Sequence, residues 1–254
     1  MIGVLRAELL KLFKRRTYWV LSLVLALLTG LIAFVFFLLP RIVEDAQQGL
    51  PAMEKPGAYI FGAQQVIGQT WFPLILAVMV LAGELATSAW ATALTRNARR
   101  WQHLIAKMVL ATFGSWLAML AAMAGWGLMA YFFAGATGFM TLTQIWDVVW
   151  KALLIMLTWV ALGFAASAWL RSVGPAIGAV LAFSFGEGLL SLWAGWRQVS
   201  LSIHTTALLG ELEAGGFGGV FGETPAFTKA LAVVLAWTVV AIGASWAGLQ
   251  YRDP

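Results

Sequence analysis

The chain has 254 residues, of which 61% are hydrophobic and only 11% are charged, whereas soluble domains carry about 25% charged residues. It contains no cysteine and two histidines, which excludes disulfide bonds and thiolate metal sites and argues against a histidine-rich metal site. The net charge of +5 does not indicate nucleic-acid binding, because the basic residues flank apolar runs. This composition predicts an integral membrane protein with no nucleic-acid partner.

The first apolar run covers residues 18–39 and contains no charged side chain. An uncharged run of ~18 residues or more predicts a membrane-spanning helix. Its apolar core is longer than the ~7–15 residues of a signal-peptide core. It also ends at Pro40 and Arg41 without a small-residue cleavage motif. We therefore expect a retained span.

Six apolar segments reach the ~20 residues that a bilayer requires. Backbone groups in hydrocarbon must bond within their own segment, so we expect helices, and the period-two alternation of a β-barrel is missing. The sequence thus predicts an all-α membrane protein that forms a single transmembrane domain over 1–254. The spans are expected at about 18–39, 66–90, 108–133, 148–170, 174–196 and 229–249.

Six spans place both termini on the same side of the membrane. Basic residues are more frequent on that side, as the positive-inside pattern requires. Both termini are therefore expected in the cytoplasm. Acidic side chains offset most of the basic ones on the outer side. The basic residues assigned to the cytoplasm are Arg6, Lys11, Lys14, Arg15, Arg16, Arg96, Arg99, Arg100, Lys107, Arg171 and Arg252.

Residues 1–17 form an arm ahead of the first span. At 100° per residue one side of this arm is apolar, while the opposite side carries Glu8, Lys11, Lys14 and Arg15, with Arg16 following. A basic amphipathic helix of this kind lies in the membrane interface with its apolar side toward the acyl chains. Two interpretations stay open: a topology anchor, or an elbow helix that also touches a cytoplasmic partner.

The connection between the second and third spans concentrates charge. Glu84 lies where an apolar helix reaches the cytoplasm, and Arg96, Arg99 and Arg100 follow before Trp101. Ionisable groups at such depth are costly and usually paired or functional. Either Glu84 folds back onto these arginines, or it is solvated at the interface beside ordinary positive-inside charge.

Glu187 lies inside the fifth expected span between two glycines. A charged side chain at the centre of a bilayer costs ~2.5 kcal/mol or more on insertion scales. We expect it to accept a structural hydrogen bond at a helix break or to face a cavity or dimer contact on the translocation path.

Several short segments together resemble the permease subunits of type-2 ABC exporters, over nearly the whole chain. They are the arm Leu5–Leu12, the segment Phe61–Gln69, the pair Gly83-Glu84, the segment Leu94-Thr95-Arg96, Arg100, the pair Ala106-Lys107, and the connection between the fourth and fifth spans from Leu162 to Ala179, around Ser167–Ser172. The chain departs from the family pattern at Ser88-Ala89, Ala91 and Asn97.

The resemblance implies an exporter permease of a bacterial or archaeal cytoplasmic membrane. The connection between spans two and three would form a coupling helix, with Glu84, Arg96, Arg99, Arg100 and Trp101 facing an ATPase subunit. Two ATPase subunits and a second permease, identical or homologous, would complete the complex. ATP and magnesium would bind the partner, because this chain lacks a phosphate-binding loop motif, and the chain itself would not be an enzyme.

Two other classes compete with this interpretation. An ion-coupled carrier or channel would use Glu84 and Glu187 as a proton path, but such proteins usually carry more intramembrane charge and inverted repeats. An intramembrane enzyme would need clustered Glu, His or Asp, whereas the two histidines fall on opposite sides of the membrane. An amphipathic or peptide-like cargo is expected, without further identification from the sequence.

Overall fold

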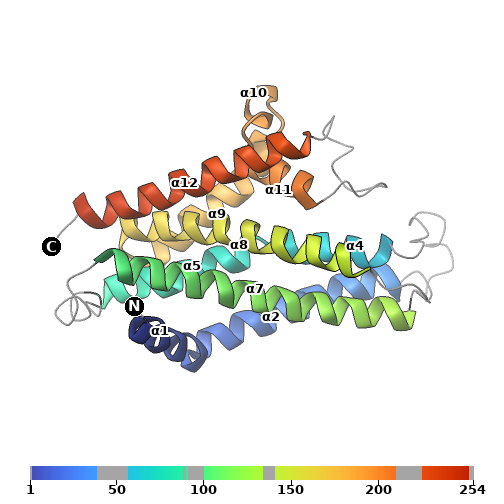
Figure 1. Ribbon diagram of the computed structural model, residues 1–254, viewed down its shortest axis with the longest axis horizontal. Helices are drawn as coiled ribbons and strands as arrows, with labels where there is room; N and C mark the ends of the chain where they lie inside the picture. Colours follow the sequence, from blue (N-terminus) through green and yellow to red (C-terminus); the bar gives the residue numbers. More distant parts are fainter. Residues whose placement is uncertain are drawn as a thin grey trace.

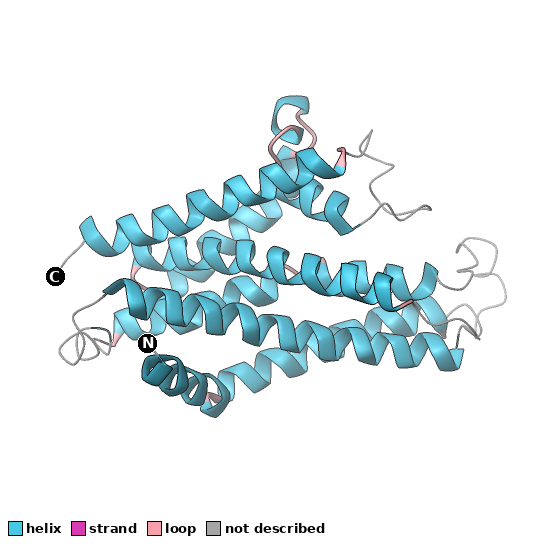
Figure 2. Ribbon diagram, viewed as in Figure 1, coloured by secondary structure: helices cyan, strands magenta, loops and turns pink. Residues whose placement is uncertain are grey.

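The structure is a computed structural model that describes residues 2–38, 57–87, 90, 100–133, 141–209 and 225–251. Every regular element in these ranges is a helix (Figures 1 and 2). The elements are α1 (Ile2–Lys14), α2 (Arg16–Phe37), α4 (Gly57–Ile67), α5 (Trp71–Ala86), α7 (Arg100–Phe133), α8 (Leu142–Leu170), α9 (Val173–Leu190), α10 (Ala194–Arg197), α11 (Leu201–Leu209) and α12 (Phe227–Tyr251).

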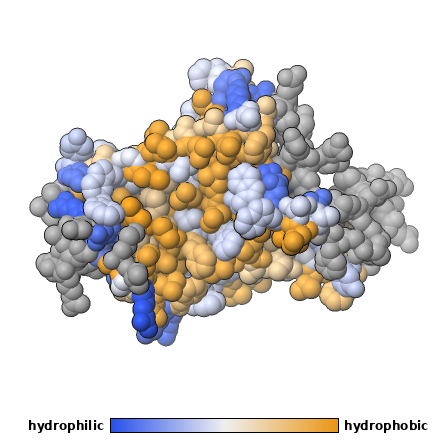
Figure 3. Space-filling view, viewed as in Figure 1, coloured by the Kyte–Doolittle hydropathy of each residue, from blue (hydrophilic) through white to orange (hydrophobic). Residues whose placement is uncertain are grey.

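Six helical stretches of the described ranges are long and apolar enough to cross a membrane, which confirms the expected number and the all-α class. Figure 3 shows the corresponding hydrophobic surface across the middle of one face, with hydrophilic residues toward the ends. The stretches are Arg16–Phe37, Gly62–Ala86, Arg100–Phe132, Leu142–Leu170, Val173–Leu190 and Phe227–Tyr251.

The spans differ from the predicted bounds at two informative places. The second span is interrupted at residues 68–70, where α4 ends and α5 begins. The third span begins at Arg100, eight residues before the predicted start at 108. Lys107, which led to the later predicted start, is accommodated inside the bundle by opposite charges described below.

The arm is a separate helix, α1, joined to α2 at Arg15. Arg15 has extended backbone angles (φ −72°, ψ 119°), so the chain changes direction there, and α1 lies at an angle to α2 (Figure 1). The buried Leu12 of α1 packs on α7 at Gly114, where an added Cβ would lie 2.8 Å from Leu12 Cδ2. Close packing therefore holds the arm against the third span.

The centre of the bundle is α8, which packs against α5, α7, α9 and α12. Trp159 and Phe164 of α8 are fully buried. Gly163 lets α5 approach α8 closely, because a Cβ there would lie 2.6 Å from Ala77 Cβ and 2.9 Å from the carbonyl oxygen of Leu74.

Helix α1, the end of α5, the start of α7 and the end of α12 all lie at one end of the bundle (left in Figure 1). This shared position brings together charges that are far apart in the sequence.

Candidate functional site

Five charged side chains from three helices meet at this end of the bundle; we call them the charged cluster. Glu8, Lys11 and Arg15 come from α1 and its junction with α2. Glu84 is in the last turn of α5, and Lys107 is in the second turn of α7. The i, i+3 spacing of Glu8 and Lys11 places both on one side of α1, toward the other two helices.

Lys107 is the centre of the charged cluster. Its side chain is fully buried, and its Nζ lies 2.7 Å from Glu8 Oε2 and 2.6 Å from Glu84 Oε2. Lys107 donates a hydrogen bond to Glu8. It also forms an ion pair with Glu84, but the angles of that contact do not meet those of a hydrogen bond. One ammonium group thus links the arm to the end of the second span.

The other two cations, Arg15 and Lys11, are the partly exposed members of the charged cluster. Arg15 Nη2 lies 3.0 Å from Glu84 Oε1, and Arg15 Nη1 donates to the carbonyl oxygen of Met79 at 2.9 Å. Lys11 Nζ lies 3.0 Å from Glu8 Oε1 and 3.5 Å from Glu84 Oε1. Both carboxylates are therefore shared by more than one helix.

Three cations and two carboxylates leave the cluster with one excess positive charge. Burial by itself would raise the pKa of Glu8, but the ammonium groups of Lys107 and Lys11 outweigh it and hold that pKa below the ordinary 4.5. Burial would lower the pKa of Lys11, but Glu8 and Glu84 outweigh it and raise that pKa above 10.5. Both groups are therefore charged at neutral pH.

The structure corrects two expectations about these residues. Glu84 is buried and ion-paired, so the solvated alternative is wrong for it. Glu8 was expected on the water-facing side of the arm but is also buried, because Lys107 compensates its charge inside the bundle. Lys14 and Arg16 are exposed, as a solvated basic face requires.

The predicted coupling residues fall partly outside the described ranges. Arg96 and Arg99 lie in an undescribed segment. Arg100 donates to the carbonyl oxygen of Leu249 in α12 at 3.3 Å, and Trp101 is 43% exposed. Glu84 and Lys107, which bound this segment on either side, are both in the charged cluster.

Sequence reasoning missed Glu8 and Lys107 as partners. Lys107 itself was the signal that could have identified the pair. It lies seven residues after the start of a helix that is otherwise mainly apolar, and a charge at that depth requires a partner. Which carboxylate it meets depends on how α1 packs against α7, and the sequence pattern alone does not give that packing.

Glu187 is buried in α9 and binds the start of a neighbouring helix. Its Oε1 accepts from the backbone N–H of Leu201 at 2.5 Å, and its Oε2 accepts from the backbone N–H of Ser202 at 2.8 Å. Both groups belong to the first turn of α11, where helical N–H groups have no partner within the helix. The expected structural hydrogen bond is present; a role on a translocation path stays a prediction.

The interruption of the second span is also held by polar side chains. Gln69 Nε2 donates to Thr29 Oγ1 of α2 at 3.0 Å, and the hydroxyls of Thr70 and Ser184 are 3.3 Å apart. Breaks in a membrane helix are tolerated where neighbouring helices satisfy the freed groups. The break therefore connects the second span to α2 and α9.

Within the described ranges, no group of three or more His, Asp or Glu side chains is arranged to hold a metal ion. No protein-family model and no curated protein matches the chain. Its functional interpretation therefore depends on the residues and geometry above.

Proposed function

We propose that the chain is a permease subunit of an ABC exporter, working with a separate ATPase subunit to move an amphipathic or peptide-like cargo. In this proposal α1 is an interfacial elbow helix, and the segment 88–99, with Arg100 and Trp101, contacts the ATPase. In the same proposal, both termini and this segment lie on the cytoplasmic side.

One observation carries the proposal: the two ends that bound segment 88–99 are ion-paired to α1. Glu84 precedes this segment and Lys107 follows it, and Lys107 contacts both Glu84 and Glu8. A force applied to the segment would reach the second span, the third span and the arm together. Such a connection suits a protein in which a partner drives rigid movement of helices.

The charged cluster also weighs against a proton path. Glu84 is engaged by cations from two helices, and Glu187 accepts two backbone hydrogen bonds. In a carrier, both side chains would have to leave these contacts during the transport cycle.

A second permease would contact α9 in this proposal. The α9 stretch is the least buried of the six candidate spans, and Phe185 and Leu189 are 76% and 73% exposed. Gly174 and Gly178 have open space around an added Cβ, and their four-residue spacing permits close approach of another helix.

Reconstitution in sealed vesicles tests the proposal against the carrier alternative. The complex purified from its native membrane should hydrolyse magnesium ATP, whereas the chain alone should not dissipate a proton gradient. Proton flux by the chain alone that is abolished by Glu84→Gln or Glu187→Gln would contradict the proposal and support the carrier.

A further inference from the structure

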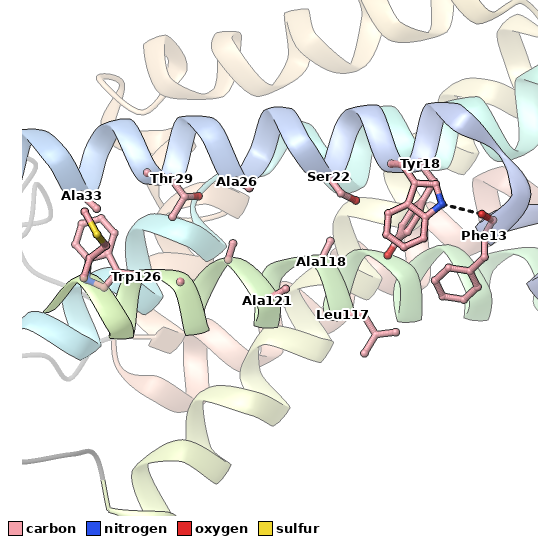
Figure 4. A pocket seen from close by; sticks show the side chains of 15 residues that line it. Phe13, Tyr18, Ser22, Ala26, Thr29, Ala33, Leu117, Ala118, Ala121 and Trp126 are labelled. Atoms are coloured by element: carbon pink, nitrogen blue, oxygen red, sulfur yellow. Dashed lines mark hydrogen bonds between the residues drawn. The ribbon is translucent and has the colours of Figure 1, made fainter. Parts of the chain in front are cut away.

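A groove of about 540 Å³ lies between α2 and α7, outside the charged cluster (Figure 4). Its volume is within the ~300–1,000 Å³ typical of small-molecule sites. Its lining comes from the end of α1, from α2 and from α7, and comprises Phe13, Tyr18, Trp19, Ser22, Ala26, Thr29, Gly30, Ala33, Leu117, Ala118, Ala121, Ala122, Gly125, Trp126 and Met129.

Small side chains keep the groove open along its length. An added Cβ at Gly30 of α2 or at Gly125 of α7 would meet no atom within 4 Å. These two positions lie on opposite walls, so the space between the helices is not filled by other parts of the described chain.

Both ends of the groove are formed by fixed aromatic rings. Trp126 is buried against Gly62, where an added Cβ would lie 2.0 Å from the indole ring, and its ring centroid is 5.3 Å from that of Phe37. At the α1 end, the indole N–H of Trp19 donates to the carbonyl oxygen of Phe13 at 2.8 Å (Figure 4).

The walls suit an apolar ligand. The Tyr18 hydroxyl donates to the carbonyl oxygen of Gly114 at 3.2 Å, and Thr29 Oγ1 accepts from Gln69 at 3.0 Å. The Tyr18 and Thr29 hydroxyls are therefore satisfied within the protein, whereas the buried Ser22 hydroxyl has no hydrogen-bond partner among the described residues. The remaining lining is mainly hydrophobic. A strongly polar ligand would lose its hydration in this groove with little compensation.

The length and position of the groove fit a lipid chain. Tyr18 and Ala33 are fifteen residues apart on one helix, which corresponds to ~22 Å at 1.5 Å per residue. This exceeds half of the ~30 Å hydrocarbon core of a bilayer. The neighbouring face of α2, with Leu23 59% and Leu27 64% exposed, would face lipid in the membrane.

The charge at the α1 end selects the head group. Lys14 and Arg16 are exposed; Lys14 directly follows groove residue Phe13, and Arg16 is two residues before groove residue Tyr18. Exposed lysine and arginine at a membrane surface attract anionic lipids. We propose that the groove binds one acyl chain of an anionic phospholipid whose phosphate lies against Lys14 and Arg16.

Photo-crosslinking in vesicles tests this site. The probes are phosphatidylglycerol and phosphatidylcholine that carry the same diazirine-labelled acyl chain, and labelled peptides are identified by mass spectrometry. In the wild-type protein we expect labelling of α2 and α7 groove residues, with phosphatidylglycerol preferred.

A matched pair of variants separates the groove from the general lipid layer. Ala121 and Ala124 are both exposed on α7, but only Ala121 lines the groove. Ala121→Leu should reduce groove labelling about tenfold, equivalent to ~1.4 kcal/mol of binding free energy, and Ala124→Leu should leave it unchanged. Gly30→Ile, on the opposite wall, should act like Ala121→Leu, and thermal melting of each variant reports whether it folds.

A second pair tests the head-group contact. Arg16→Gln should abolish the preference for phosphatidylglycerol while Arg6→Gln, which removes an exposed charge farther along α1, should retain it.

Equal labelling of folded Ala121→Leu and Ala124→Leu would overturn the site and identify ordinary boundary lipid. Equal labelling by both lipids in the wild-type protein, or crosslinks from the groove to a second copy of the chain, would overturn it as well.

Discussion

Lys107 determines how three helices meet at one end of the bundle. Its ammonium group is fully buried between Glu8 and Glu84. Removing one member of a buried ion pair costs ~3–5 kcal/mol, because the remaining charges lose their compensation. The charged cluster is therefore sensitive to single changes although it contains five charges.

We expect Lys107→Met to lower the stability of the detergent-solubilised protein by ~3–5 kcal/mol. Thermal melting measures the effect, and the control is Arg6→Met, which removes an exposed cation of α1 and should change stability by about 0.5 kcal/mol or less. Equal melting temperatures for the two variants would show that Lys107 is not ion-paired as described.

Glu187 is expected to act through α11. Glu187→Gln removes the negative charge and one of the two backbone acceptors, so the first turn of α11 should open more often. Hydrogen–deuterium exchange should be faster at Leu201 and Ser202, while assembly of the protein is retained and transport by the complex is impaired. Unchanged exchange together with full transport activity would contradict this role.

At the scale of elements, the sequence predicted the six spans well because each is long and apolar enough to cross a bilayer. The later predicted start of α7 and the missed break between α4 and α5 have different physical reasons. Lys107 looks unfavourable in a membrane when taken singly, and Glu8 and Glu84 make its position acceptable. Gln69 lies inside the predicted second span, and the break beside it is held by a contact with Thr29 that the sequence pattern does not give.

The packing of α1 against α7 should depend on pH. The pKa of Glu8 is lowered on folding, so its contribution to stability is present above pH 4.5 and is lost as the pH falls through the lower pKa of the folded state. The pKa of Lys11 is raised, so its contribution is present below pH 10.5 and is lost as the pH rises through the higher pKa of the folded state.

Melting temperatures between about pH 3 and pH 11 measure this effect. We expect Glu8→Gln to reduce the loss of stability on the acid side relative to the wild-type protein. An acid limb that is identical in the wild-type protein and in Glu8→Gln would show that other carboxylates govern it.

The contact between α5 and α8 depends on a missing side chain at Gly163. Gly163→Ala places a Cβ against Ala77 and the backbone of Leu74, so we expect a loss of ~1–3 kcal/mol from overpacking. Gly243→Ala is the control, because an added Cβ there meets no atom within 4 Å. Thermal melting should separate the two variants; a neutral Gly163→Ala would mean that these helices are farther apart.

At the scale of the whole molecule, the sequence predicted where charge accumulates but not which charges meet. Glu84 was recognised as important, whereas its contacts with Lys11 and Arg15 depend on the angle between α1 and α2. Its contact with Lys107 depends on how α5 packs against α7. The proposed permease function would give this connection between α1, α5 and α7 a purpose. The groove between α2 and α7 was not foreseen, because it depends on the distance between two helices.

The most direct test of the permease proposal is purification of the chain from its native membrane in mild detergent, followed by identification of the proteins that accompany it. We expect an ATP-binding chain in stoichiometric amount, lost when Arg96, Arg99 and Arg100 are changed to alanine and retained when Lys151, Arg197 and Lys229 are changed instead. Recovery of the chain alone, without ATPase activity, would contradict the proposal.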